Sequence, residues 1–312
     1  MQLRHLHYFT VLAAERHFRR AAEACHITQS TLSAAIRQLE DELGVPIIER
    51  DKRFKGLTPE GRALLDWAHR VLAERRSLDQ EIGMLRDTLT GELRIGVIPA
   101  ALPTISLLTT PFNRRHPGVT LQVLSRTSNE VQNALDDYAF DAGVTYLDNE
   151  PLHSVRSIPL YQEHYILLTP ADGPFAGRDQ VTWREVAETP LCLLTPDMQN
   201  RRIIDGIFAS VDKKPRVLVE TNSVMTLCSH IRIGAWSSVF PHNFLWVFGT
   251  PPGMLALPLV DPVKTHQVGL VVPDREPLAP VVRALEAVAR SANIDREFRS
   301  LLERWGLERK AS

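Results

Sequence analysis

The feature that most constrains this chain is an apolar heptad pattern between residues 64 and 89. With Arg75 as the one interruption, steps of four and three alternate through Leu64, Ala68, Val71, Leu78, Ile82, Leu85 and Leu89. Thr58-Pro59-Glu60 provides an N-cap, a proline at the first helical position and an acid at the positive end of the helix dipole. The pattern predicts one long helix over residues 59–90. A single helix cannot bury such a stripe on itself, so we expect a partner helix from a second chain. The alternative is that the helix packs on its own domain.

This predicted helix separates two regions of different character. Residues 1–58 show short helical patterns with almost no strand signal. From Gly91 onward, β-branched runs alternate with helical patterns, which is typical of an α/β domain. The length of 312 residues also favours two or three domains. We therefore expect a small helical domain over 1–58, a linker and dimerisation helix over 59–90, and an α/β domain over 91–312.

The first region has the pattern of a helix-turn-helix. Apolar spacing predicts one helix from Leu3 and a short second helix from Phe18. A third helix follows the N-cap Thr28 and ends at Gly44. Its polar face offers groups that hydrogen-bond bases and phosphates, although a merely solvated face is the alternative. The residues expected to contact DNA from the helices are Arg19, Thr28, Gln29, Ser30, Thr31, Ser33 and Arg37.

A basic segment follows the third predicted helix. Residues 46–58 form a short β excursion whose tip carries Arg50, Lys52, Arg53 and Lys55. Beside a helix-turn-helix such a loop is a wing, so we expect Arg50 and Arg53 to reach phosphates or the minor groove. The whole chain has 36 Lys and Arg against 37 Asp and Glu, which argues against a purely electrostatic, histone-like binder. Double-stranded DNA is the expected partner of this winged helix-turn-helix.

Residues 1–90 resemble the N-terminal region of LysR-type transcriptional regulators. The residues that carry the resemblance include Leu3-Arg4-His5-Leu6-His7-Tyr8-Phe9, Thr28-Gln29-Ser30-Thr31-Leu32-Ser33 and Leu57-Thr58-Pro59-Glu60-Gly61. His17, Ser30 and Ala34 depart from the family's usual Ser, Pro and Arg, so no contact is assigned to position 34. The resemblance implies a homodimer or homotetramer on a palindromic operator. It also implies control by a small-molecule effector, with RNA polymerase as a further candidate partner.

The remainder of the chain is similar to the effector domain of the same family. Strands are expected over 93–98, 119–124 and 142–146, then over 163–168, 191–194, 216–219 and 237–240, and finally over 267–272. The resemblance implies a periplasmic-binding-protein-like α/β domain of two Rossmann-like lobes. Lobe I takes about 91–161 and 267–312, and lobe II about 162–266. A ligand then lies between the lobes, at strand ends and helix N-termini.

The effector site is assigned by match to the family. The expected effector-binding residues are Pro99, Ala100, Ala101, Thr127, Ser128, Thr195, Met198, Asn222, Ser223 and Trp236. Ala100 stands where many relatives have Ser or Thr, and Trp236 stands where a second glycine is usual. As alternatives, Ser128 and Asn222 are plain helix caps and Trp236 is packed core.

The same segments indicate a small effector that is polar or anionic. Backbone amides at the start of the helix after Pro99 can bind an anion. Hydroxyl groups at Ser128 and Thr195 can add donors. Three arginines lie close in sequence to the cleft segments, namely Arg126, Arg201 and Arg202.

Other classes of function are less favoured. The chain lacks a Gly-x-Ser-x-Gly elbow, a Gly-rich phosphate loop and His-Glu-x-x-His, and its eleven histidines are scattered, so we expect neither an enzyme nor a metal or cofactor. Without a signal-peptide core or a run long enough to span a membrane, we expect a cytoplasmic protein rather than a periplasmic solute-binding protein. A cysteine redox-sensing regulator of the same fold is the alternative, although Cys192 and Cys228 lie in patterns that favour inert burial.

Overall fold

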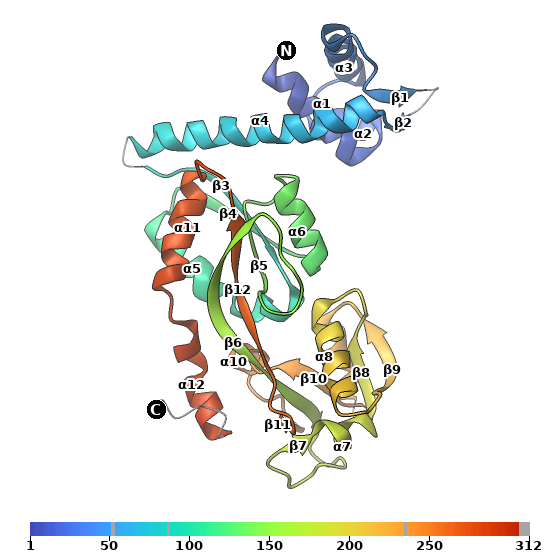
Figure 1. Ribbon diagram of the computed structural model, residues 1–312, viewed down its shortest axis with the longest axis vertical. Helices are drawn as coiled ribbons and strands as arrows, with labels where there is room; N and C mark the ends of the chain where they lie inside the picture. The colour runs from blue at the N-terminus through green and yellow to red at the C-terminus, as the bar shows by residue number, and fades with distance from the viewer. Residues whose placement is uncertain (51–53, 86–87, 234–235, 306–312) are drawn as a thin grey trace. The chain divides into compact units, whose positions relative to one another are not determined.

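A computed structural model describes residues 1–50, 54–85, 88–233 and 236–305 (Figure 1). The chain divides into two compact units. The first takes residues 1–91 together with the short segment 137–139, and the second takes the rest of the chain from Glu92.

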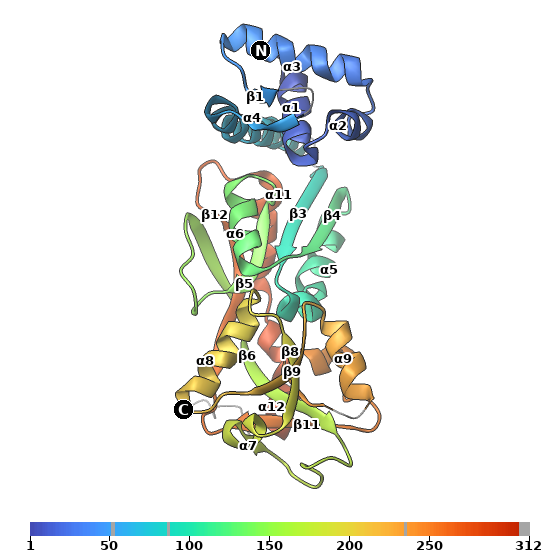
Figure 2. The ribbon, with the colours of Figure 1, turned by 90° about the vertical axis from the view of Figure 1, so that its right-hand side faces the viewer.

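The first unit is a three-helix domain with a β-hairpin and a long fourth helix. Its elements are α1 (Leu3–Glu15), α2 (Phe18–Ala24), α3 (Gln29–Leu43), β1 (Ile48–Arg50), β2 (Phe54–Leu57) and α4 (Pro59–Met84). One apolar cluster holds them together, and Phe9, Leu32 and Ile36 within it are fully buried. The hairpin strands pair antiparallel, which is the arrangement of a wing (Figure 2).

Polar caps fix where these helices begin and end. Thr28 Oγ1 accepts from the Thr31 amide at 3.1 Å at the start of α3, and Gly44 ends that helix with a φ of 71°. His17, which replaces the family's usual serine, still caps α2 because its Nδ1 accepts from the Arg20 amide at 3.4 Å. The predicted boundaries of α3 are therefore confirmed.

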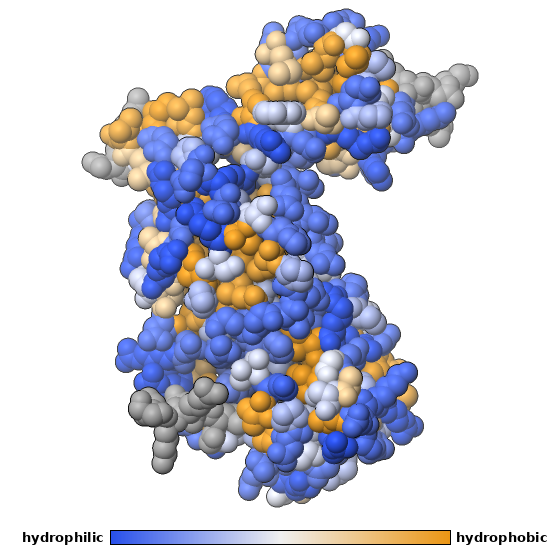
Figure 3. Space-filling model, viewed as in Figure 1, coloured by the Kyte–Doolittle hydropathy of each residue, from blue (hydrophilic) through white to orange (hydrophobic). Residues whose placement is uncertain are grey.

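The heptad stripe of α4 is divided between two roles. In its first part Ala68 is fully buried, and Leu64 and Val71 pack against the core of the first unit. In its last part Leu78 is 54% exposed and Ile82 is 45% exposed. Apolar surface covers this end of α4 in Figure 3. The helix ends at Met84 rather than at residue 90. Packing on its own domain therefore explains the first half of the stripe and leaves the second half uncovered.

The second unit is built on a curled sheet that runs through two lobes. Its strands are β3 (Gly91–Val97), β4 (Val119–Ser125), β5 (Ala142–Tyr146), β6 (Val155–Pro170), β7 (Val181–Thr182), β10 (Ser238–Pro241), β11 (Met254–Val260) and β12 (Thr265–Pro273). Their order is β4-β3-β5-β12-β6-β11-β7, with β10 also paired to β6. A separate parallel pair is formed by β8 (Pro190–Leu194) and β9 (Arg216–Thr221).

Helices cover this sheet and line the space between the lobes. They are η1 (Pro99–Thr104), α5 (Ser106–Arg115), α6 (Ser128–Asp136), α7 (Trp183–Ala187), α8 (Gln199–Ser210), α9 (Val224–Arg232), α10 (Phe244–Phe248), α11 (Pro280–Ser291) and α12 (Ile294–Arg304). In lobe I, α5 and α11 lie together on one face of the sheet and α6 on the other (Figure 1).

The central strand β6 belongs to both lobes. Its first half pairs with β12, and its second half pairs with β10 and β11. Of β6, only residues 163–168 were expected as a strand, and β11 was not expected. Pro159, Gln162 and Glu163 break the apolar pattern of β6. Pro159 is tolerated because it pairs with Gly269 at an irregularity in the ladder.

Candidate nucleic-acid interface and effector cleft

The start of α3 forms a polar, exposed surface. Gln29, Ser30, Thr31 and Arg37 are exposed, and Ser33 is half-buried. The opposite side of the helix is buried in the core. The side chains that sequence analysis assigned to DNA contact therefore lie on the solvent side of one helix.

Four of the expected DNA-contacting side chains already form hydrogen bonds within the protein. The Thr28 hydroxyl serves as the cap of α3 and lies 2.8 Å from both Ser30 Oγ and Thr31 Oγ1. This network orients the hydroxyls of the first turn. Arg19 is exposed, and its guanidinium donates to Glu23 at 2.9 Å.

The wing joins directly onto α4. The Thr58 hydroxyl donates to the Pro46 carbonyl at 2.8 Å while it caps α4 by accepting from the Gly61 amide at 2.9 Å. Gly61 lies so close to Ile47 that a Cβ built on it would be 1.9 Å from the Ile47 carbonyl oxygen. Arg50 is the last residue of β1, and Arg53 lies outside the described residues.

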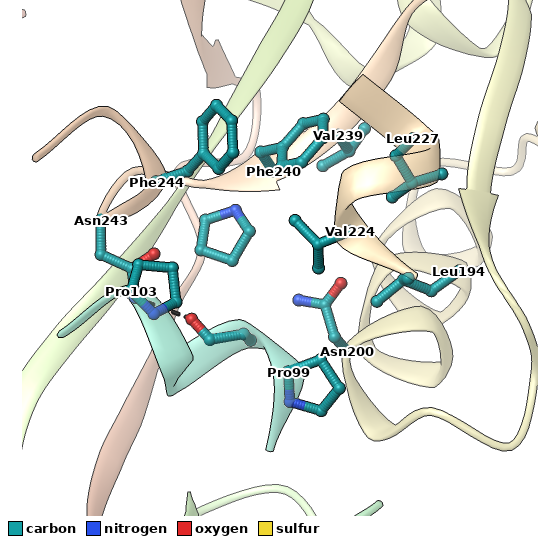
Figure 4. A pocket seen from close by; sticks show the side chains of 12 residues that line it. Pro99, Pro103, Leu194, Asn200, Val224, Leu227, Val239, Phe240, Asn243 and Phe244 are labelled. Atoms are coloured by element: carbon teal, nitrogen blue, oxygen red, sulfur yellow. Dashed lines mark hydrogen bonds between the residues drawn. The ribbon is translucent and has the colours of Figure 1, made fainter. Parts of the chain in front are cut away.

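Two adjoining hollows lie between the lobes of the second unit. Together with the open space at its mouth, the larger takes up about 330 Å³ and the smaller about 230 Å³. The larger is lined by Pro99, Ala100, Pro103, Leu194, Asn200, Val224, Leu227, Val239, Phe240, Pro241, Asn243 and Phe244 (Figure 4). The smaller is lined by Ile98, Pro99, Ala100, Thr127, Ser128, Tyr146, Leu194, Met198, Gln199 and Asn200. Both lobes contribute, so this is the cleft that the two-lobe fold implied.

The expected effector residues divide between these hollows and their surroundings. Five of them line a hollow, namely Pro99, Ala100, Thr127, Ser128 and Met198. The other five do not belong to either lining: Ala101, Thr195, Asn222, Ser223 and Trp236.

Local structure explains several of these positions. Thr127, not Ser128, caps α6, because its hydroxyl accepts from the Glu130 amide at 3.2 Å. Ser223, not Asn222, caps α9, because its hydroxyl accepts from the Thr226 amide at 3.3 Å. Trp236 packs on the core of lobe II, which agrees with the alternative that it is a core residue.

The three nearby arginines are engaged with protein groups. Arg126 donates to the Ser125 carbonyl at 2.8 Å. Arg201 is buried and pairs with Asp205 and Glu220. Arg202 pairs with Glu150 of lobe I at 2.7 Å. The expectation of an anionic effector therefore finds no support in these side chains.

The expected effector residues did not include the polar and aromatic groups that other segments bring to the cleft. Tyr146 ends β5, and Phe240, Asn243 and Phe244 come from the β10–α10 segment. A signal was present, because Pro241, His242 and Asn243 interrupt an otherwise apolar run. Buried polar groups in such a run require partners, and they often mark a site.

A buried acid lies beside the cleft on β6. Glu163 is fully buried, and Tyr146 Oη donates to its Oε1 at 2.5 Å. Asn200 on α8 donates in turn to Tyr146 Oη at 2.9 Å. Burial raises the pKa of Glu163 to about 8, against the lowering effect of the hydrogen bond from Tyr146. The chain Asn200–Tyr146–Glu163 thus links lobe II, lobe I and the strand that they share.

The cysteines are poor nucleophiles in this environment. Cys192 is fully buried, and burial raises its pKa and that of Cys228 to about 11. Burial also raises the pKa of Cys25. Since the thiolate is the reactive form, all three side chains are held as thiols at neutral pH.

The structure also bears on metal binding and on membrane insertion. Within the described residues, no group of three or more His, Cys, Asp or Glu side chains is arranged to hold a metal ion. None of the helices that the structure describes combines the length and the apolar character that crossing a bilayer needs.

Comparison with known proteins decides the family. The model of the LysR substrate binding domain matches residues 86–293, and that of the bacterial regulatory helix-turn-helix protein of the lysR family matches residues 3–62. The chain belongs to the LysR-type transcriptional regulators.

Its relatives in this family include peroxide-responsive regulators. The DNA-binding transcriptional dual regulator OxyR of Escherichia coli K12 is 29% identical over 97% of this chain and 99% of its own. A probable hydrogen peroxide-inducible genes activator of Mycobacterium xenopi is 36% identical over 56% of this chain and 93% of its own.

Solved structures of this family share the fold. A cysteine-to-aspartate variant of full-length OxyR from Pseudomonas aeruginosa has a TM-score of 0.74 at 27% identity, covering 95% of this chain and 97% of its own. Full-length CbnR in complex with its target DNA has a TM-score of 0.68 at 20% identity, covering 94% of this chain and all of its own. The two-lobe α/β domain behind a helix-turn-helix is therefore the architecture of this LysR-type regulator.

Proposed function

We propose that this LysR-type regulator reads its operator with the first turn of α3. The observation that carries the proposal is the single exposed face bearing Gln29, Ser30, Thr31 and Arg37 opposite a fully buried stripe. Gln29 can pair with adenine, and Arg37 can reach guanine or phosphate. Ser33 and the Thr28 cap support this face, while Arg19, Arg50 and Arg53 are assigned to the DNA backbone or minor groove.

Gel-shift titrations against the operator test this assignment. Gln29→Ala removes a base contact, so it should weaken operator binding by about 1–3 kcal/mol and relax specificity. Arg37→Ala removes a cation, and loss of a phosphate contact should lower affinity for all sequences and flatten the salt dependence. The control is Gln38→Ala, which changes an exposed residue of the same helix. Operator affinity unchanged in both test variants contradicts the proposal.

The assembly follows from the exposed half of α4. Two copies of the helix that pair through Leu78, Ile82 and Leu85 give a symmetric dimer, and two-fold symmetry of the heads requires a palindromic operator. We extend this proposal to a homotetramer, with RNA polymerase as the partner through which transcription changes. Such a regulator acts in the cytoplasm, where the DNA is.

The two hollows between the lobes are proposed as the effector site. Pro99, Ala100, Thr127, Ser128 and Met198 lie in their linings, and the remaining assigned residues, Ala101, Thr195, Asn222, Ser223 and Trp236, lie in the segments around them. Bound effector would shift the equilibrium between lobe arrangements. This role requires reversible binding and no catalysis, metal or cofactor.

The names of the relatives favour a second candidate, a response to hydrogen peroxide. Oxidation by peroxide requires an accessible thiol that readily ionises. The three cysteines of this chain have raised pKa values, and Cys192 is fully buried. We therefore favour reversible effector binding over thiol oxidation as the input signal.

Peroxide treatment separates the two inputs. Operator binding by the wild type and by the variant Cys25→Ser/Cys192→Ser/Cys228→Ser is measured before and after exposure. We expect no change in either protein. A peroxide response in the wild type that the triple variant lacks would establish the cysteine mechanism instead.

A further inference from the structure

The larger hollow has an apolar lining with little to attract a charge. Among the described residues that line it, none is charged, and the polar side chains are Asn200 and Asn243 (Figure 4). Pro99, Pro103 and Pro241 provide no N–H donor. An anion moved into such a lining loses its hydration and meets no charged side chain among the described lining residues.

Two aromatic rings define one wall of this hollow. Phe240 and Phe244 both line it, and their ring centroids are 4.7 Å apart at an interplanar angle of 39°. Val224 and Leu227 of α9 continue the apolar surface opposite η1 (Figure 4). This surface suits the apolar body of a small molecule.

One lining group requires a hydrogen bond that the protein does not supply. Asn243 is 0% exposed, and its Nδ2 donates to the Ala100 carbonyl at 3.0 Å and to Tyr161 Oη at 2.9 Å. Its Oδ1 is buried and accepts no hydrogen bond from the residues that the structure describes. A buried amide oxygen without a donor is unfavourable, so a ligand that donates to it gains affinity.

We propose that the larger hollow binds a small uncharged molecule with an apolar body that donates one hydrogen bond to Asn243 Oδ1. The apolar body packs on Phe240 and Phe244. This inference rests on the proposed function, because it names the class of effector for the same cleft. It differs from the polar or anionic effector that the sequence favoured.

Matched compounds test the class directly. Benzyl alcohol offers a donor on a neutral ring, toluene lacks the donor, and benzoate carries a negative charge on a ring of the same size. Each is added at equal concentration to the full chain at neutral pH, and the melting temperature is measured, since a ligand of the native state raises it. We expect benzyl alcohol to raise it most and to bind about tenfold more tightly than toluene. Benzoate should have no effect.

Variants assign the binding to this hollow. Val224→Trp fills the hollow from α9 and should abolish the effect of benzyl alcohol. Met225→Trp, at the next and largely exposed position of the same helix, should leave it unchanged. Asn243→Leu should remove the preference for benzyl alcohol over toluene. If Asn243→Leu fails to fold, the wild-type comparison and the Val224 variant still decide the matter.

Three results would overturn the proposal. Benzoate could stabilise the protein more than benzyl alcohol, the neutral compounds could have no effect, or their effect could survive Val224→Trp. Operator binding is measured on the same samples. A failed ligand test with intact operator binding refutes the ligand class alone, whereas loss of operator recognition in the wild type refutes the proposed function.

Discussion

Glu163 makes the stability of the second unit depend on pH in a defined direction. Its carboxyl is fully buried, and its pKa is raised from 4.5 to about 8. Between these two values the folded protein keeps the proton that the unfolded chain has lost. The folded state therefore binds more protons, and the free energy of unfolding falls as the pH rises until the folded carboxyl has ionised near pH 8.

The size of this effect follows from the titration. Between pH 6.5 and 8.5, a group with a folded pKa of about 8 and an unfolded pKa of 4.5 removes about 2 kcal/mol from the free energy of unfolding. Buried His164 and His242 act in the opposite direction, because their lowered pKa values make the folded state release protons that the unfolded chain binds near pH 6.5. The informative quantity is therefore the difference between the wild type and Glu163→Gln.

Urea unfolding at the two pH values measures this difference. Glu163→Gln retains the histidines but has no carboxyl, so it should gain about 2 kcal/mol relative to the wild type between pH 6.5 and 8.5. Tyr146→Phe removes a hydrogen bond that lowers the pKa of Glu163, so its transition should move to higher pH. A stability difference between the wild type and Glu163→Gln that is equal at both pH values refutes the buried, protonated carboxyl.

Three further predictions concern the first unit. Gly61→Ala should destabilise it by about 2–3 kcal/mol in thermal unfolding because the added methyl meets the Ile47 carbonyl, whereas Gly206→Ala in α8 meets open space and should not destabilise the protein. Leu78→Asp should dissociate the dimer in sedimentation experiments, with Arg76→Glu on the opposite face of α4 as a charge-changing control, and an unchanged assembly contradicts the interface. Thr28→Ala should cost about 1 kcal/mol of stability through the lost cap of α3, and equal melting temperatures would contradict that role.

The helices of the first unit could be predicted because local rules decide them. Thr28, Gly44 and Thr58 are cap residues with a short-range role, and each does in the structure what the sequence indicated. The sequence also correctly predicted that the heptad positions of α4 form an apolar stripe. Periodicity alone cannot say which part of a stripe its own domain covers, because that depends on where α1 and the wing fold back.

The cleft could be predicted only where its residues follow a strand or start a helix. Pro99, Ala100 and Ser128 occupy such places and do line it. Asn243 and Phe244 come from a segment distant in sequence, and only the pairing of β10 with β6 brings them to Ala100. The three arginines near the cleft segments were wrongly taken to favour an anionic effector. Nearness in sequence does not show which carboxylate a guanidinium will pair with.

The direct junction between the wing and α4 has a mechanical consequence. Thr58 and Gly61 hold the first turn of α4 against the strand before it, so the DNA-reading head and the helix move as one lever. With 26 residues, this lever is about 39 Å long. A tilt of about 5° at one end displaces the other by roughly 3 Å, close to the rise of one base pair. In the proposed dimer, a slight rotation between the two α4 helices would therefore be enough to move a head from one base step to the next.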